Sequence, residues 1–288
     1  MTAKLKMSHS DACQKFMLEE ANVRGVIVHL TNSYRTILMQ HDYPPIVQRY
    51  LGEVLLAATM LMQTIKLDGR MTIQFQSDGP VKILVAQINS AGHLRGLAQW
   101  DRSAPDAELE NGLGDGMLVT TIFHAHHLQP MQSMVSLEKR SIADALAFYF
   151  QQSEQLPTLF SFAVKDDMAS GMLLQILPEH TRPERHQEWE KLVERVNKIE
   201  VQELFYDNNA SFLQYHFPEE SIRLFDSQDL SFVCGCTVEK MANAISVMGE
   251  AEANLILKEK AEIVVTCEYC NHHYAFDREK TAEIFRKH

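Results

Sequence analysis

The sequence lacks a hydrophobic run long enough to cross a membrane, and it lacks an excess of positive charge. No apolar stretch reaches the roughly 18 residues that a membrane helix needs, so we expect no membrane partner. Lys and Arg number 27 against 38 Asp and Glu, which gives a formal net charge of -11. Because proteins that bind a phosphate backbone present a basic face, we expect no nucleic-acid partner. Met1 to Phe16 has no apolar signal-peptide core, so we expect a cytoplasmic protein.

Cysteine is also scarce, and its distribution is uneven. Of the five cysteines, only Cys13 lies outside a C-terminal cluster formed by Cys234, Cys236, Cys267 and Cys270. A CxC and a CxxC separated by a long insert are typical of a four-thiolate metal site. Zinc suits tetrahedral sulfur coordination, and four protein ligands leave no open position for catalysis. We therefore predict one zinc ion per chain and no enzymatic activity.

The same four thiolates are open to oxidation, since the thiolate is the reactive form of cysteine. Disulfide formation would remove zinc ligands two at a time, and the nearest partners in sequence favour the pairs Cys234–Cys236 and Cys267–Cys270. An inert zinc ribbon has the same ligands, so the cysteines alone do not decide between a redox switch and a permanent structural site. His272 and His273 follow the CxxC, but four sulfurs already complete a tetrahedron. We therefore expect these histidines to lie beside the site and not in it.

Hydrophobic periodicity predicts an α+β protein with three regions. Residues 1–178 predict a large mixed core domain of strands around a long buried helix at about 45–66. Residues 179–231 are dense in charge and predict a helical linker. Residues 232–288 predict a small zinc-binding module with two helices, a hairpin at the CxxC and a final helix capped by Asp277. The strands expected in the core domain are at about 24–31, 71–75, 81–85, 94–97, 117–123, 132–138, 158–165 and 170–177.

The predicted linker carries one apolar stripe at helical spacing. Its members are Trp189, Leu192, Val193, Val196 and Ile199. Because an isolated helix of this length is marginal in water, the stripe has to be buried on another element. The zinc module follows directly in sequence, so we expect it to hold the linker in place. Loss of zinc would then expose this stripe to clients or to a second subunit. A helical pair packed permanently on the core is an equally good interpretation.

Several other stretches occur in the order found in one known family. They are Leu51-Gly52-Glu53, Ser77-Asp78-Gly79-Pro80, residues 149–158, Gln175-Ile176-Leu177-Pro178 and residues 267–271. Together with the CxC, they resemble the heat-shock-protein-33 family of redox-regulated bacterial chaperones over essentially the whole chain. Two positions depart from the family pattern, namely Ser77, where Gly is common, and residues 131–133, where Tyr-Gln-Gly is usual. Both are remote in sequence from the cysteines.

The resemblance implies a function that spacing alone does not give. In this family the reduced, zinc-bound protein is inactive, and oxidants aided by unfolding conditions form two disulfides and release zinc. The C-terminal module and the linker then lose structure, and the protein forms a homodimer that holds unfolding client proteins without ATP. The four clustered cysteines match the zinc and switch positions of the family one for one. Cys13 has no counterpart among them and lies near a terminus that we expect to be mobile, so we expect it to be dispensable.

Two alternatives belong to other functional classes. A zinc-ribbon nucleic-acid-binding protein would need a basic, aromatic surface around the ribbon, whereas residues 234–288 are mixed in charge. A thiol–disulfide oxidoreductase would need the CxxC at the N-terminus of a helix, whereas here the pattern predicts a hairpin.

Overall fold

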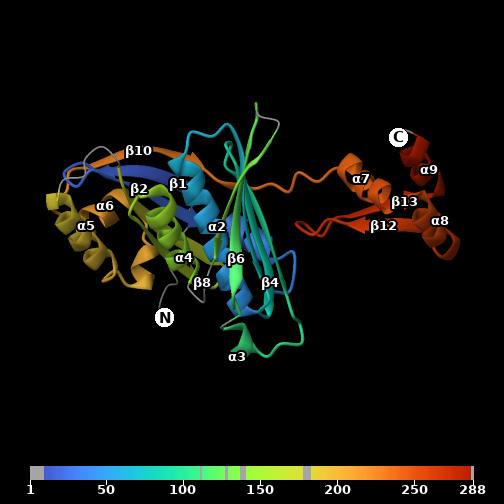
Figure 1. Cartoon of the computed structure of the whole chain (residues 1–288), viewed down its shortest axis with the longest axis horizontal. Coiled ribbons are helices and arrows are strands. Elements are labelled where there is room, and N and C mark those ends of the chain that lie inside the picture. Colours follow the sequence, from blue (N-terminus) through green and yellow to red (C-terminus); the bar gives the residue numbers. More distant parts are fainter. Residues whose placement is uncertain (1–9, 111, 127–128, 137–140, 178–182, 287–288) are drawn as a thin grey trace, which may run out of the picture. The chain divides into compact units, whose positions relative to one another are not determined.

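The computed structural model describes residues 10–110, 112–126, 129–136, 141–177 and 183–286. The chain separates into two compact units, Met1–Phe232 and Val233–His288. Residues 178–182, at the predicted border between the core domain and the linker, lie outside the described residues. Within the described part, no helix is both long and apolar enough to span a membrane. The mixture of helices and sheets confirms the predicted α+β class (Figure 1).

The first unit contains two sheets in which sequence neighbours pair antiparallel. The five-stranded sheet has the order β10-β1-β2-β9-β8 and the six-stranded sheet has the order β11-β5-β4-β3-β6-β7. The strands of the first are β10 Ile222–Asp229, β1 Ala12–Leu18, β2 Val23–Leu30, β9 Met168–Ile176 and β8 Thr158–Lys165. Those of the second are β11 Ser231–Phe232, β5 His93–Trp100, β4 Val81–Asn89, β3 Gly69–Ser77, β6 Gly116–His124 and β7 Met131–Ser136.

Helix α2, Pro45–Thr64, fills the space between the two sheets, as the predicted buried helix at 45–66 requires. Pro45 stands at its first turn, where a missing amide hydrogen costs nothing. Small residues let the strands approach it. A Cβ built on Gly96 of β5 would lie 3.1 Å from Leu55, and one on Gly171 of β9 would lie 2.8 Å from Met60. The other helices of this region are α1 Asn32–Leu38, α3 Asp106–Leu109 and α4 Ile142–Tyr149, which continues into a π-helical turn at Phe150–Glu154.

The five-stranded sheet is buried on both faces because its strands are apolar at successive positions. On β2, Val26 and Val28 join the cluster around α2, whereas Val23 and Ile27 join a second cluster on the opposite face. That second face is covered by α5 Pro183–Val196, a 3-10 helix at Val201–Leu204 and α6 Asn209–His216. In Figure 1, α5 and α6 lie beyond this sheet, on the side away from the six-stranded sheet.

The apolar stripe of the linker is therefore covered by the five-stranded sheet of its own unit. Leu192 and Val196 are each 4% exposed and pack with β-sheet residues such as Phe16 and Met172. Trp189 and Ile199 pack partly buried on the same cluster, while Val193 is half-buried outside it. The partner of the stripe thus differs from the zinc module that we expected. A face of a sheet formed by distant strands cannot be recognised from the stripe alone.

Buried polar contacts fasten the linker to this sheet. His29 of β2 places Nε2 at 3.1 Å from Oδ1 of Asn209 and Nδ1 at 2.9 Å from the hydroxyl of Ser170. The Ser170 hydroxyl donates to the carbonyl oxygen of Leu204 at 2.6 Å. Asn209 also donates to the side chain of Gln14 on β1 at 2.7 Å. Hydrogen bonds in such a low-dielectric setting specify one position of the linker, because every alternative leaves buried polar atoms unpaired.

The end of the predicted helical linker is not helical. Residues 222–229 form β10, which pairs with β1 at the edge of the five-stranded sheet, and residues 231–232 form β11, which pairs parallel with β5 of the other sheet. This short segment therefore joins both sheets immediately before the second unit begins. Half-buried and exposed side chains alternate only over residues 222–225, and three acidic or amide residues lie near the end of β10, so its sequence has no clear apolar strand pattern.

Cys13 also lies elsewhere than expected. It is part of β1 and only 2% exposed, so the chain around it is not a mobile terminus. Burial raises the pKa of its thiol to about 11, which makes the reactive thiolate rare at neutral pH. Strand β1 is hard to recognise in the sequence because polar residues are mixed with its apolar ones and a polar segment precedes it.

The second unit matches its predicted elements closely. It contains α7 Val238–Met248, α8 Glu250–Glu259, β12 Glu262–Thr266, β13 His273–Asp277 and α9 Arg278–Arg286. The side chain of Thr237 caps α7, and that of Asp277 accepts from the amide of Lys280 in the first turn of α9. Its fully buried apolar core is very small, consisting of Ile245, Ala253, Leu257, Ile263 and Phe276. A core of this size is too small to stabilise a fold unless a disulfide, a structural metal or a partner subunit adds stability.

The linker, which covers one face of the five-stranded sheet, contains one unfavourably buried group, the hydroxyl of Tyr206. Its hydroxyl is buried and has no hydrogen-bond partner among the described residues, while its ring stacks on Phe212 at 3.8 Å between ring centroids. An unpaired buried hydroxyl costs about 1–3 kcal/mol. We predict that Tyr206→Phe raises the free energy of unfolding of the first unit by a value in this range, measured by urea denaturation. Tyr215→Phe, at a ring that is 75% exposed, is the matched control and should change little. A destabilised Tyr206→Phe variant would contradict the prediction.

Candidate metal centre

The four clustered cysteines all lie in the second unit, on two separate segments. Cys234 and Cys236 lie in the extended segment between β11 and α7, and Cys267 and Cys270 lie in the turn between β12 and β13. The fold of this unit brings the two segments together, although more than thirty residues separate Cys234 from Cys267 in the chain. The predicted ligands are therefore assembled by the helical insert α7–α8 and by the β12–β13 hairpin.

The four sulfur atoms have the spacing of a single-ion site. All four Sγ atoms lie within 4.8 Å of one another, with 3.4 Å between Cys234 and Cys267 and 3.5 Å between Cys236 and Cys270. Four ligands at the usual Zn–S length of about 2.3 Å lie about 3.8 Å apart in a tetrahedron. A disulfide would bring two sulfurs to about 2.05 Å, and all five cysteines are free thiols. The geometry and the donor atoms thus fit one metal ion.

The CxC segment bends at Gly235, as the sequence predicts. Gly235 has φ +64°, a left-handed conformation that favours glycine, and a Cβ at this position would meet nothing within 4 Å. Glycine is therefore needed for the backbone angle and not for space. The Nζ atom of Lys240 donates to the carbonyl oxygen of Gly235 at 2.5 Å, which ties the bend to the first turn of α7.

The CxxC segment forms a closed turn. The amide of Asn271 donates to the carbonyl oxygen of Cys267 at 2.8 Å, and the amide of Cys267 donates to the carbonyl oxygen of His272 at 2.9 Å. Asn271 has φ +54°, which asparagine tolerates better than most residues. Because the turn connects two strands, the CxxC does not lie at a helix N-terminus. The setting of a thiol–disulfide oxidoreductase is therefore missing from this turn.

The surroundings of three of the four thiols shift their pKa values, and the shifts differ in direction. Burial opposes ionisation of Cys236, but hydrogen bonds from the Tyr274 hydroxyl and the other three thiols outweigh it and lower the pKa to about 7. Burial raises the pKa of Cys270, although a backbone hydrogen bond from His272 favours its thiolate. Burial likewise raises the pKa of Cys234. A bound cation removes this conflict, because it stabilises all four thiolates together.

The two histidines after the CxxC lie outside the ligand group. Nδ1 of His273 is 2.8 Å from the hydroxyl of Thr266, and the ring of His272 stands edge-on against Tyr274 at 4.6 Å. The cluster of possible ligands found among the described residues contains the four cysteines and neither histidine. The expectation that both lie beside the site agrees with this arrangement.

Sequence reasoning missed one residue that touches the site. The hydroxyl of Tyr274 on β13 donates to Sγ of Cys236 at 3.1 Å. This hydrogen bond raises the pKa of Tyr274 to about 12. The sequence did contain a signal, since Tyr274 is the first Tyr, Phe or Trp after the CxxC and the hairpin folds it back toward the cysteines.

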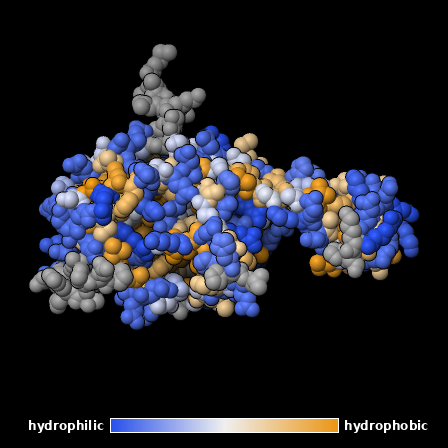
Figure 2. All heavy atoms as spheres, turned by 90° about the horizontal axis from the view of Figure 1, so that it is seen from above, coloured by the Kyte–Doolittle hydropathy of each residue, from blue (hydrophilic) through white to orange (hydrophobic). Residues whose placement is uncertain are grey.

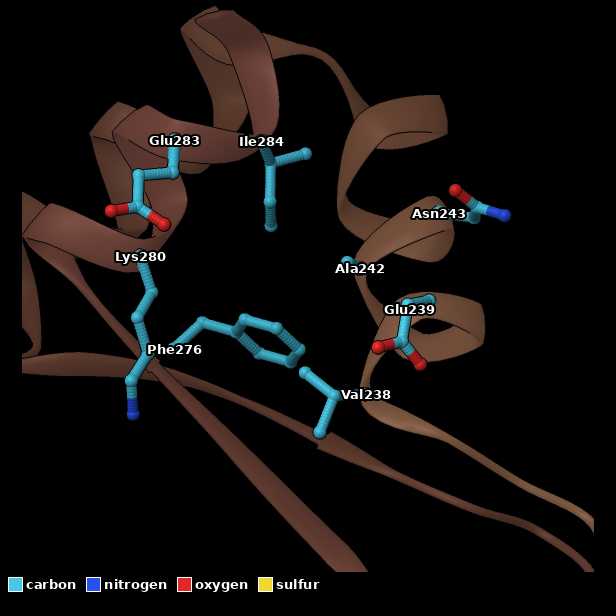
Figure 3. A pocket seen from close by; sticks show the side chains of 8 residues that line it. All are labelled: Val238, Glu239, Ala242, Asn243, Phe276, Lys280, Glu283 and Ile284. Atoms are coloured by element: carbon cyan, nitrogen blue, oxygen red, sulfur yellow. The ribbon is translucent and has the colours of Figure 1, made fainter. Parts of the chain in front are cut away.

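A separate pocket lies in the same unit, between α7 and α9 (Figure 3). Val238, Ala242, Phe276 and Ile284 give it an apolar floor, and Glu239, Lys280 and Glu283 stand around it. Its volume of about 270 Å³ is slightly below the range of roughly 300–1,000 Å³ that is usual for small-molecule sites. None of its lining residues is a cysteine, so this pocket is distinct from the candidate metal centre.

Comparisons with known proteins confirm the predicted resemblance to the heat-shock-protein-33 family. The Hsp33 protein family matches residues 11–277. The 33 kDa chaperonin of Nitrosococcus oceani is 38% identical and covers 97% of this chain and 96% of its own length. The 33 kDa chaperonin of Shewanella loihica is 37% identical, with 96% of each chain covered. The crystal structure of the 33 kDa chaperonin from Thermotoga maritima has a TM-score of 0.85 and 25% identity, covering 97% of this chain and 99% of the other.

Removal of the metal should unfold the second unit selectively. Its five-residue buried core is small, and a structural metal can contribute roughly 10–16 kcal/mol of apparent binding energy in such a module. We predict that a strong chelator abolishes the resistance of residues 233–286 to limited proteolysis, while residues 12–176 stay resistant. Addition of excess metal after the chelator is the control and should restore the resistance. If the second unit stays resistant without metal, the site is not what stabilises it.

Proposed function

The chain belongs to the Hsp33 family, and we propose that it is a redox-regulated, ATP-independent chaperone that binds unfolding proteins and prevents their aggregation. The observation that carries this proposal is the group of four thiols within 4.8 Å of one another in a unit with a very small core. In the proposed resting state, Cys234, Cys236, Cys267 and Cys270 hold one zinc ion. Curated relatives are named chaperonins, which supports a non-enzymatic role in binding unfolded clients.

Zinc is the metal that this donor set favours. Four thiolates in a closed tetrahedron suit zinc, whereas hard cations such as magnesium and calcium prefer oxygen ligands. X-ray absorption of the reduced protein should therefore show four sulfur ligands and no nitrogen. When bound, zinc supplies charge stabilisation to the thiolates and a cross-link between the CxC and CxxC segments. The residues of the chain supply the ligands, the turn geometry and the partial exposure that lets an oxidant reach Cys234, Cys236 and Cys270.

Oxidation is proposed to disassemble this site. Two thiolates that form one disulfide lose two electrons, and one molecule of hydrogen peroxide takes these with two protons to give two molecules of water. Two such reactions use all four ligands and release the ion. We propose the pairs Cys234–Cys236 and Cys267–Cys270, because each pair stays close after the module unfolds. The folded geometry does not select them, since the short sulfur distances of 3.4 and 3.5 Å join the other combinations.

The linker is proposed to transmit the loss of the module. Cys234 lies two residues after β11, and β11 and β10 connect it directly to α6 in the chain. When the second unit unfolds, the residues that follow β11 are no longer ordered. This loss lowers the free energy needed to detach β10, α5 and α6 from the five-stranded sheet. Detachment would expose Leu192 and Val196 together with the sheet face that now covers them. Large exposed apolar surfaces of this kind bind unfolded chains or a second subunit.

The surface of the present structure is consistent with a resting state. On the face shown in Figure 2, hydrophobic atoms form separate patches between hydrophilic ones. The large apolar side chains of the five-stranded sheet that could bind a client, such as Phe16, Leu18 and Ile27, are instead buried beneath the linker at 1% exposure or less. We propose that this covered face is the client-binding surface and that the oxidised protein forms a homodimer in the cytoplasm.

A direct test compares the reduced and oxidised full-length protein. We predict that only the peroxide-treated protein suppresses aggregation of a thermally unfolding client, measured by light scattering without ATP, and that one zinc ion per chain is released in parallel. Cys13→Ser is the matched control. It should activate normally, because the buried Cys13 thiol takes no part in the switch. Equal activity of the reduced, zinc-loaded and oxidised forms would contradict the proposal.

A substitution on the buried face of the linker should weaken the proposed resting state without changing the metal ligands. Leu192→Asp places a charge in a position that is 4% exposed, where even truncation of a leucine costs about 2–5 kcal/mol. We predict partial suppression of aggregation by the reduced, zinc-loaded variant. Gln187→Asp, at an exposed position of the same helix, makes the same change of charge and should behave as wild type. An inactive reduced Leu192→Asp variant with intact zinc content would show that the linker does not cover the client surface.

A further inference from the structure

A side chain outside the ligand set contacts one of the sulfur atoms. We propose that Tyr274 is a positioning residue that holds the Cys236 thiolate in the zinc site and shields it from oxidants, an inference that rests on the proposed zinc switch. The contact is the hydrogen bond of 3.1 Å from the Tyr274 hydroxyl to Sγ of Cys236. Tyr274 thereby bridges two segments, since it belongs to β13 and Cys236 precedes α7.

The ring of Tyr274 is held firmly in place. Its backbone pairs with Val265 in the β12–β13 ladder, and its half-buried ring packs beside the core of the second unit. The ring of His272 stands edge-on against it at 4.6 Å with an interplanar angle of 73°, a favourable aromatic arrangement. The direction of the hydroxyl is therefore set before any ion binds, so little entropy is lost when it donates to the sulfur.

The donor at Cys236 differs in kind from two others in the site. Cys270 receives a backbone hydrogen bond from His272, and Cys234 receives one from Cys236. The two turns fix these backbone donors, so the donors are present in every variant that keeps the turns. The donor from Tyr274 is a side chain, so a single substitution removes it while the backbone stays the same.

This hydrogen bond has two chemical consequences for a thiolate. Four thiolates and one Zn²⁺ carry a net charge of −2, so a donor that shares the sulfur charge stabilises the assembled site. The same donor draws electron density from the sulfur, which makes it a weaker nucleophile. Groups that hydrogen-bond metal ligands typically change metal affinity by about 10–100-fold when they are removed. Tyr274 therefore raises the threshold at which the switch responds.

The step that Tyr274 restrains is attack on a peroxide. The Cys236 sulfur forms a bond to one oxygen while the O–O bond breaks, and the departing hydroxide takes a proton to become water. The resulting sulfenic acid is then attacked by a second thiolate, which forms the disulfide and releases a second hydroxide. Without the donor from Tyr274, the first of these steps is faster because the sulfur is more electron-rich.

Tyr274→Phe in the full-length chain tests the inference, since it removes the hydroxyl and keeps the ring. We expect a 10–100-fold lower zinc affinity by chelator competition and faster zinc release by hydrogen peroxide. In the zinc-loaded, reduced protein, pulsed iodoacetamide labelling read by mass spectrometry should show faster modification of Cys236 relative to Cys270. Thr266→Val is the matched control, because it removes a hydrogen bond of 2.8 Å from the same hairpin without touching a sulfur. It should leave the labelling ratio unchanged.

The outcomes separate this inference from the proposed function. If the wild type binds zinc and releases it on oxidation, but Tyr274→Phe keeps the wild-type affinity and labelling ratio, the role of Tyr274 is refuted and the switch stands. If all four cysteines of Tyr274→Phe are labelled faster by the same factor, Tyr274 only supports the fold and the inference is also refuted. If the wild type neither binds zinc nor loses it to peroxide, the proposed function fails and the role of Tyr274 fails with it.

Discussion

Four thiolates cannot remain close together without a cation, and in the proposed function the second unit depends on that constraint. Its five fully buried apolar residues provide little burial, whereas its four cysteine sulfurs lie within 4.8 Å of one another. Ionising four thiols at this spacing is unfavourable without a cation, and a bound metal ion would stabilise the thiolates and cross-link the CxC and CxxC segments. In the proposed function, the stability of the unit therefore depends on the redox state of these four cysteines. A fold with a larger core would survive oxidation and would make a poor sensor.

The linker is the second part of the proposed switch. It covers an apolar sheet face in the first unit, and its burial of Leu192 and Val196 is complete enough to hide that face. Its attachment is nevertheless not optimised, because the buried hydroxyl of Tyr206 has no partner among the described residues. Polar contacts through His29 and Ser170 fix its position, while β10 and β11 connect its helices in the chain to the segment that carries Cys234. Such a cover, specific in position but with one unpaired buried group, would suit the proposed detachment of the linker when the second unit unfolds.

The sequence predicted those parts of the structure whose signals are local. The ligand set follows from cysteine spacing, α2 from a long helical period, and the caps of α7 and α9 from Thr237 and Asp277. The bend at Gly235 was also predictable, since few residues other than glycine adopt its φ of +64°. The predictions that were wrong concern residues whose packing partners lie far away in the sequence. Strand β10 is an edge strand without a clear apolar alternation, Cys13 is buried only because β1 lies between β2 and β10, and the linker stripe packs on strands far away in the chain. Tyr274 was missed because its contact with Cys236 exists only after the hairpin folds.

The central claim is that oxidation of the second unit releases the linker of the first. Hydrogen exchange measured by mass spectrometry on the full-length protein, before and after peroxide treatment, tests it most directly. The account predicts that amides in residues 187–216 and in β10 lose protection on oxidation together with the second unit, while α2 and the six-stranded sheet keep theirs. Unchanged protection of residues 187–216, in a protein whose zinc has left and whose four cysteines are oxidised, would contradict the account.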